Sequence, residues 1–206
     1  MAAAPDLTAA LPGYRARRGR IDVVELPPAR YLMVDGQGDP NTAARYADAL
    51  ATLYPVAYRL KFFSKRELGR DHRVLPLEAL WWADDLASFT TARDKDRWRW
   101  TAMIRTPDWI TREDVDTVVA AVAAAGAPSL LSDLRWDTLE EGLVAQTLHV
   151  GPYDAEAPAL ARLHDEVLPA QGLRPTGHHH EIYLTDARRT APERLRTILR
   201  QPVARV

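Results

Sequence analysis

A chain of 206 residues, with 47% apolar and 27% charged side chains, has ample material for a core and fits one large domain or two fused halves. Its formal net charge of −1 gives no reason to expect nucleic acid or an acidic membrane surface as a direct partner. Without cysteine, the chain can have no disulfide, thiol nucleophile or thiolate metal site, and no apolar run approaches the ~20 residues of a membrane span.

The chain begins with a segment rich in Ala, Pro, Gly and Arg. We expect residues 1–20 to form an N-terminal arm with little packing of its own. The segment lacks a basic start followed by a sustained apolar stretch, so it does not resemble a signal peptide. We therefore expect a cytoplasmic protein.

Three strands and one helix are predicted in the first half. Residues 29–34, 74–82 and 97–106 are short apolar or alternating runs, which are typical of strands. Between the first two, apolar residues recur at helical spacing from 43 to 57, which predicts a helix. The residues that follow this helix, 61–71, predict a charged connection to the next strand.

A second helix is predicted after the third strand. Thr111 suits its N-cap, acidic residues occupy its first turn, and Gly126 is a stop signal. Residues 127–141 predict a connector without regular structure.

The second half repeats the order of the first. Residues 142–150 predict a strand, and a turn follows it. Residues 160–167 carry a helical stripe, and residues 178–186 and 195–203 predict two more strands. The order strand–helix–strand–strand therefore occurs twice in this sequence.

The segment HHHEIYLTD, residues 178–186, is the most informative of these strands. In a strand, side chains alternate between two faces, so the odd positions share one face and the even positions the other. Ile182 and Leu184 make the even face suitable for a core, whereas the odd face places Glu181 beside Tyr183. A carboxylate between aromatic residues is either solvated, paired or kept for a ligand.

The repeat predicts the fold class. The two half-repeats span about residues 29–126 and 142–203, and Glu78 falls opposite Glu181 when they are aligned. Neither unit can bury both faces of its strands alone. We therefore predict an α+β fold in which two pseudo-symmetric modules form a curved antiparallel sheet. Both helices would cover one face, and the uncovered concave face would be a ligand groove that includes Glu78 and Glu181.

Clustered aromatic residues supply the other candidates for this groove. Five of the six tryptophans lie between positions 81 and 109, which indicates a packed core, a ligand cage or both. The candidate ligand-binding residues are Trp82, Trp98, Trp100, Tyr183, Glu78, Phe63 and Met103. Aromatic side chains at strand spacing are more often core than cage, so a core role stays open for them.

Metal binding is not expected. The three consecutive histidines at 178–180 would point to alternating faces of a strand, so they cannot jointly chelate one ion in the usual way. No phosphate-binding glycine loop or metalloprotease motif occurs either. We therefore expect no metal and no cofactor.

Several segments together resemble the GyrI-like small-molecule-binding family. In the second half they are GLVAQTLHVGPYD and HHHEIYLTD with PERLRTILRQPV; in the first half they are ARYLMVDGQGDPNT, VLPLEALWW and WRWTAMIRTP. They resemble the stand-alone branch of the family rather than domains fused to a DNA-binding helix-turn-helix. The resemblance implies one domain at residues 21–206, with two strand–helix–strand–strand modules about a ligand groove. The family often has Tyr just before its motif Glu, where this chain has His180.

The resemblance also implies a function. Some members of the family bind bulky aromatic or cationic compounds, with a buried Glu as an electrostatic anchor. Some stand-alone members hydrolyse the strained cyclopropane of DNA-alkylating natural products. The motif Glu corresponds to Glu181, which would act as general base on a water molecule. A tyrosine hydroxyl, with Tyr153 as the candidate, would steady the carbonyl that accepts the electrons.

Two other functions stay open. The same groove could belong to a sequestering module without catalysis, in which Glu181 is only an anchor. A third reading is a protein-interaction module that modulates a large target such as gyrase. In the first two cases the partner is an aromatic small molecule, and we expect a monomer or a weak homodimer.

Overall fold

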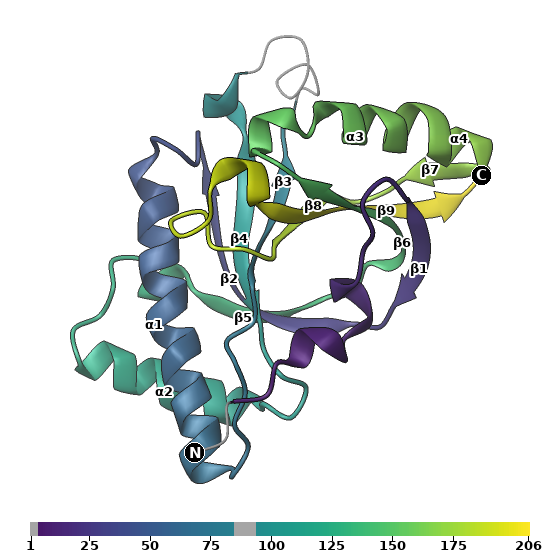
Figure 1. Ribbon diagram of the computed structural model, residues 1–206. Helices are drawn as coiled ribbons and strands as arrows, with labels where there is room; N and C mark the ends of the chain where they lie inside the picture. Colours follow the sequence, from purple (N-terminus) through teal and green to yellow (C-terminus); the bar gives the residue numbers. More distant parts are fainter. Residues whose placement is uncertain (1–3, 85–93) are drawn as a thin grey trace. The chain divides into compact units, whose positions relative to one another are not determined.

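A computed structural model describes residues 4–84 and 94–206 of the chain (Figure 1). It comprises two compact units. The first unit contains Ala29–Leu75 and Trp81–Leu139, together with the residues up to Leu7; the second contains Thr8–Pro28, Pro76–Leu80 and Glu140–Val206. The strand β3 (Leu77–Trp82) begins in the second unit and ends in the first.

Three strands of the first unit pair side by side and antiparallel. The central strand is β2 (Ala29–Gln37), which pairs with β4 (Arg99–Arg105) along one edge and with β5 (Arg135–Leu139) along the other. The helix α1 (Ala44–Glu67) packs against β2 and against α2 (Arg112–Ala124).

The helix α2 begins as predicted. Thr111 is its N-cap, and a reciprocal pair of hydrogen bonds between Thr111 and Asp114 forms a capping box. The helix ends at Ala124, two residues before Gly126, whose φ of 108° suits a residue without a side chain.

The helix α1 is longer than predicted. Residues 61–67 continue it, although we expected a connection from 61 onward. The buried positions Val56, Leu60 and Ser64 are four residues apart, so the core-facing stripe extends through the charged segment. Lys65 and Arg66 lie in the last turn, where positive charge is favourable.

The strand β5 was missed by the sequence analysis, which predicted a connector for residues 127–141. It is held by Trp136, which is 6% exposed and donates a hydrogen bond of 3.0 Å to the Thr106 hydroxyl. The guanidinium groups of Arg30 and Arg112 lie 5.0 and 4.8 Å from the centre of the Trp136 ring.

The strands of the second unit are also antiparallel to their neighbours. Its strands follow the order β1 (Asp22–Leu26), β6 (Gly142–Val150), β9 (Arg196–Arg205) and β8 (His179–Tyr183). The short strand β7 (Leu173–Pro175) also pairs with β9. The predicted strand at 142–150 is confirmed with the same bounds.

The helical segment of the second unit has three parts. It starts as α3 (Ala157–Ala161), widens into a π-helical turn at Arg162–Val167 and ends as α4 (Leu168–Ala170). Short 3-10 turns complete the described elements: Leu7–Ala9, Pro12–Tyr14, Lys95–Arg97, Leu131–Asp133, Tyr153–Ala155 and Pro192–Arg194.

The element order repeats as the sequence predicts. The first module is β2, α1, β3 and β4; the second is β6, the α3–α4 segment, β8 and β9. In each module the last strand returns to pair antiparallel with the first. The predicted fold class is therefore confirmed: α+β, with antiparallel strands in two strand–helix–strand–strand modules. Within residues 4–84 and 94–206, no helix combines the length and apolar character needed to cross a membrane.

One close contact in the first unit depends on a glycine. Gly36 lies directly opposite Trp100 in the pairing of β2 with β4, and a Cβ added at Gly36 would lie 2.2 Å from the Trp100 ring. We expect Gly36→Ala to reduce the free energy of unfolding by about 1–3 kcal/mol, because the buried ring must move. Urea unfolding of Gly36→Ala, Trp100→Phe and the double variant measures the coupling. Strictly additive effects of the two substitutions would contradict this contact.

Candidate functional site

The side chains of β8 alternate between two environments, as predicted. His180 and Ile182 are fully buried, whereas His179, Glu181 and Tyr183 are partly exposed. In the pairing of β8 with β9, Glu181 lies opposite Leu199 and Tyr183 lies opposite Thr197. Opposite residues of paired strands project to the same side of a sheet, so one face carries the odd-numbered residues of these strands.

The odd-numbered face is the one that the helical segment covers. Leu163 and Leu168 of that segment form a buried cluster with Ala145 of β6 and Val203 of β9, which both project to this face. We call it the helix-covered face. The prediction that Glu181 lies on an uncovered concave face is therefore wrong: its face of the sheet carries the helix of its own module.

Glu181 is held at this face by its neighbours on the same strand. Tyr183 donates a hydrogen bond of 2.7 Å to Oε2 of Glu181, and Nε2 of His179 lies 3.5 Å from Oε1. The side chain of Glu181 is 15% exposed. The ring of Tyr153 meets that of Tyr183 edge-on, with 5.6 Å between their centres. The structure thus brings together Glu181, Tyr183 and Tyr153, three of the residues that the sequence singled out.

A second carboxyl group, that of Glu156, was missed by the sequence analysis, although its pKa responds to the charge of Glu181. It precedes α3 and is 5% exposed. Burial raises the pKa of Glu156 to about 9, helped by the negative charges of Glu181 and Asp154, while the neighbouring Thr197 hydroxyl acts in the opposite direction. Glu156 is therefore a neutral carboxylic acid at neutral pH. Its sequence context, Asp-Ala-Glu before a helix, indicated only a turn and cap.

Two histidines also belong to the helix-covered face. His164 lies on the π-helical turn, a kind of turn that often occurs at functional sites. Its pKa is lowered by burial and then by the nearby His179. Within residues 4–84 and 94–206, neither ring nitrogen of His179 has a hydrogen-bond partner.

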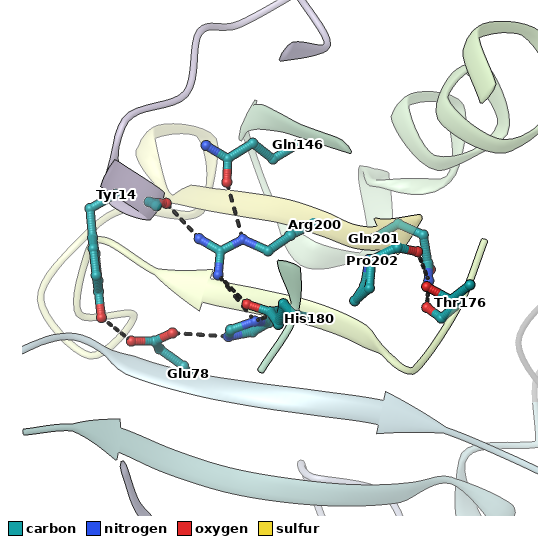
Figure 2. A network of polar contacts seen from close by, with 10 residues as sticks. Tyr14, Glu78, Gln146, Thr176, His180, Arg200, Gln201 and Pro202 are labelled. Atoms are coloured by element: carbon teal, nitrogen blue, oxygen red, sulfur yellow. Dashed lines mark hydrogen bonds and ion pairs between the residues drawn. The ribbon is translucent and has the colours of Figure 1, made fainter. Parts of the chain in front are cut away.

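The opposite face of the same strands carries a buried polar network (Figure 2). His180 places Nε2 2.9 Å from Glu78 and Nδ1 2.9 Å from Glu141, and Tyr14 donates a hydrogen bond to the other oxygen of Glu78. His180, Glu78 and Tyr14 are 0, 1 and 7% exposed. The expectation of an arm with little packing of its own is thus wrong for Tyr14.

Arg200 completes this network. It donates a hydrogen bond of 2.7 Å to Glu141, one of 3.1 Å to the side chain of Gln146 and one of 2.6 Å to the carbonyl of Gly13. Burial acts to raise the pKa of Glu141, but the charges and hydrogen bonds of His180 and Arg200 outweigh it and lower that pKa to about 2. Burial acts to lower the pKa of His180, but Glu141 and Glu78 outweigh it and raise that pKa.

The network corrects the prediction for Glu78. This residue bonds to His180, which points to the face of β8 opposite to Glu181. Both carboxylate oxygens of Glu78 accept hydrogen bonds within the second unit, so neither is left for a ligand. The departure from the family pattern at His180 also gains a reason, because His180 is the residue that joins Glu78 to Glu141.

The predicted residues of the first unit divide into two groups. Trp100 and Met103 are 0% exposed, and the Trp100 ring packs edge-on against Tyr46 at 4.9 Å. They are core residues and offer no surface to a ligand, which corrects the ligand-binding prediction for both. Trp82, Trp98 and Phe63 are partly exposed and stay candidates. The Trp98 ring lies edge-on to that of Trp81 at 5.8 Å.

A cavity of about 290 Å³ in the second unit lies away from these residues. It is lined by the end of β6, including Thr147 and His149, and by Pro158 and Arg162 of the helical segment. No residue predicted for the ligand site lines it.

The family of the chain follows from comparison with known proteins. A family model of the GyrI-like small molecule binding domain matches residues 20–204, so the chain belongs to the GyrI-like family. The resemblance stated from the sequence is thereby confirmed. Among curated proteins, a search found no match.

Solved structures give the same result. A conserved protein of Listeria innocua, described as uncharacterized, is 34% identical to this chain, with a TM-score of 0.85 over 97% of this chain and 99% of that one. A hydrolase from the same organism is 33% identical, with a TM-score of 0.82 over 97% and 99%. The C-terminal domain of EcmrR shares the fold at 12% identity, with a TM-score of 0.55 over 91% and 98%.

The buried network predicts how the protein responds to acid. We expect Glu141→Gln to reduce the free energy of unfolding near pH 7 by about 3–5 kcal/mol, because Arg200 and His180 lose their charged partner. The pKa of Glu141 is about 2 in the folded protein and ordinarily 4.5. Its contribution is therefore complete above pH 4.5 and is lost as the pH falls toward 2. Unfolding curves at several pH values test this.

The matched control for this experiment is Glu140→Gln, which changes the exposed neighbour in the sequence. Its unfolding should follow the wild type at every pH. The prediction fails if Glu141→Gln is equally harmless near pH 7, or if the deficit persists unchanged at pH 2.5.

Proposed function

We propose that this GyrI-like protein binds bulky aromatic small molecules at Glu181 and hydrolyses those that carry an electrophilic cyclopropane. The observation that carries the proposal is the state of Glu181. Its side chain is 15% exposed, one carboxylate oxygen accepts a hydrogen bond from Tyr183, and the other lies 3.5 Å from Nε2 of His179. A carboxylate that is mostly shielded from solvent and oriented by a neighbouring hydroxyl can act as a general base on a water molecule.

The chemistry follows from these groups. Glu181 would take a proton from a water molecule, whose oxygen then attacks the methylene carbon of the cyclopropane. The strained carbon–carbon bond breaks, and its electron pair moves into a conjugated carbonyl. Ring strain supplies much of the driving force, so the protein mainly positions the ligand and activates water. The Tyr153 hydroxyl is the proposed donor to the carbonyl oxygen.

Within the first unit, Trp82 and Trp98 stay proposed stacking surfaces for flat aromatic compounds. Both are partly exposed, and the Lys95 ammonium lies 5.6 Å from the centre of the Trp98 ring. The Trp98 ring thus already attracts a cation through its π face, the interaction that would also hold a cationic ligand.

The 33% identity to a protein described as a hydrolase supports turnover over simple sequestration. A sequestering protein would bind the same compounds without forming product. The two functions therefore differ in one measurable quantity, the amount of product formed per mole of protein.

The deciding variant is Glu181→Gln, which keeps the shape of the side chain and removes its charge and its basicity. We expect turnover of a spirocyclopropyl cyclohexadienone to fall by roughly 10²–10⁴-fold. Affinity for a neutral aromatic ligand should stay unchanged. Mass spectrometry of the water adduct measures turnover, and tryptophan quenching measures affinity.

Glu193→Gln is the control, because Glu193 belongs to the same unit and its side chain is 74% exposed. Its turnover should equal that of the wild type. If the wild type forms less than one product per protein, the hydrolase proposal is wrong and sequestration replaces it. If Glu181→Gln turns over normally, Glu181 is not the base.

A further inference from the structure

The cavity of about 290 Å³ in the second unit has no part in the proposed chemistry. Its walls come from the last residues of β6, from the helical segment and from Arg18, Gly19 and Ile21, which precede β1. Its volume is at the lower end of the range for ligand pockets, about 300–1,000 Å³. The cavity therefore fits a small molecule rather than a bulky one.

Two arginines give this cavity a positive charge. Arg18 lines it from the chain before β1, and Arg162 lines it from the π-helical turn. In the part of the chain that the structure describes, no acidic residue lines the cavity, and neither arginine forms an ion pair. The acidic residue that follows Arg18 most closely in the sequence, Asp22, is already paired with Arg17 and Arg20. The charges of Arg18 and Arg162 are therefore left for another partner.

The guanidinium group of Arg162 is held at the cavity by the backbone. Its Nη1 donates a hydrogen bond of 2.8 Å to the carbonyl of Gly19, which also lines the cavity. A guanidinium group has five N–H groups, so this bond leaves most of them for a further acceptor. Arg18 and Arg162 are both exposed, so a ligand can reach them from solvent.

The edge of β6 adds a backbone donor to the cavity. The pairing of β1 with β6 stops before residues 147–150, which extend beyond β1. There the backbone N–H of Leu148 donates to the carbonyl of Arg17, at 3.4 Å. Alternate residues of an antiparallel strand direct their N–H groups to the same edge, so the N–H of Val150 also points away from β9. Val150 lines the cavity, where this N–H suits an anion.

Much of the remaining lining is apolar. Thr147 and His149 also line the cavity, but their side chains already contact the backbone carbonyls of Arg17 and Pro152. Apolar surface attracts the apolar body of a ligand, whereas guanidinium groups bind the oxygens of carboxylates and phosphates. The apolar residues of the lining are Ile21, Leu148, Val150, Ala155, Pro158 and Ala159.

We propose that this cavity is a second binding site, which takes a small organic molecule with a carboxylate or phosphate group. The oxyanion lies at the guanidinium groups of Arg18 and Arg162, and the apolar body packs against Leu148 and the helical segment. The site differs from the one at Glu181 in the charge that it selects. Its existence does not depend on the proposed function.

Amide NMR of the full chain locates the site. We expect benzoate and phenyl phosphate, added in separate titrations, to shift the backbone amide signals of Gly19, Leu148 and Val150 until the signals saturate. Benzyl alcohol has a similar ring without the charge, so it should leave these signals in place. The tighter of the two anions identifies the preferred head group. Inorganic phosphate should bind roughly 10-fold more weakly than phenyl phosphate, because it buries no apolar surface.

Arg18→Gln and Arg162→Gln test the role of the two charges. Each should weaken the binding of both anions by roughly 10-fold or more, since hydrogen bonds to a charged group are lost. Arg162→Gln also loses the bond to Gly19, whereas in the described residues the side chain of Arg18 has no hydrogen bond to lose. Arg18→Gln therefore tests the charge without a change in the fold.

Arg174→Gln is the matched control, because Arg174 is an exposed arginine of the same unit that does not line the cavity. Its affinity for both anions should equal that of the wild type. Ala159→Phe should weaken binding without a change of charge, because the added ring occupies the cavity.

Three results would overturn the site. The first is that neither anion shifts the amide signals of Gly19, Leu148 and Val150. The second is that benzyl alcohol shifts them with the same affinity. The third is that Arg18→Gln binds both anions as tightly as the wild type. Glu181→Gln should leave the binding of both anions unchanged, so a failure of the proposed function and a failure of this site are distinguishable.

Discussion

The alternation of side chains along β8 is the constraint on which the rest of the second unit depends. Neighbours in a strand must point to opposite faces. His180 therefore enters a buried network with Glu78 and Glu141, while Glu181 projects from the helix-covered face. One face of this five-residue strand therefore contributes His180 to the buried network, and the other face carries the candidate base Glu181. A shift of the register by one residue would exchange the two roles.

The pKa values of two buried carboxyl groups in the second unit shift in opposite directions. Glu141 is buried between Arg200 and His180, so its pKa falls to about 2 and it stays ionised. Glu156 is buried near Glu181 and Asp154, so its pKa rises to about 9 and it stays neutral. Burial raises the pKa of both; the sign of the neighbouring charges decides the outcome. Neighbouring cations thus keep the buried Glu141 ionised, whereas neighbouring anions favour the protonated form of the buried Glu156.

Much of the fold could be predicted from the sequence, because local patterns determine it. The strand at residues 142–150 and the Thr111 cap depend on short stretches, and both are confirmed. The strand β5 was missed because it is held by long-range contacts of Trp136 with Thr106 and Arg30, which no local pattern contains.

The candidate site was harder to predict for the same reason. Glu181 and Tyr183 are two residues apart in one strand, so alternation places them together. The repeat aligns Glu78 with Glu181, but an alignment does not determine the face to which a side chain projects. Glu78 points to its hydrogen-bond partners Tyr14 and His180. The burial of Glu156 is a tertiary property that its sequence neighbours do not reveal.

In the described part of the chain, the buried polar side-chain atoms of the second unit that lack a hydrogen-bond partner belong to a few residues. Within residues 4–84 and 94–206, its buried side-chain atoms without a hydrogen-bond partner belong to Glu156, His179 and Thr197. In the pairings of β8 and β9 with their neighbours, Thr197 shares its face with Tyr183. On the opposite face, the carboxylates of Glu78 and Glu141 and the ring of His180 are fully bonded. Folding alone favours full bonding on both faces. In the proposed function, a ligand bound at Glu181 would lie on the same face as these groups and could bond to them.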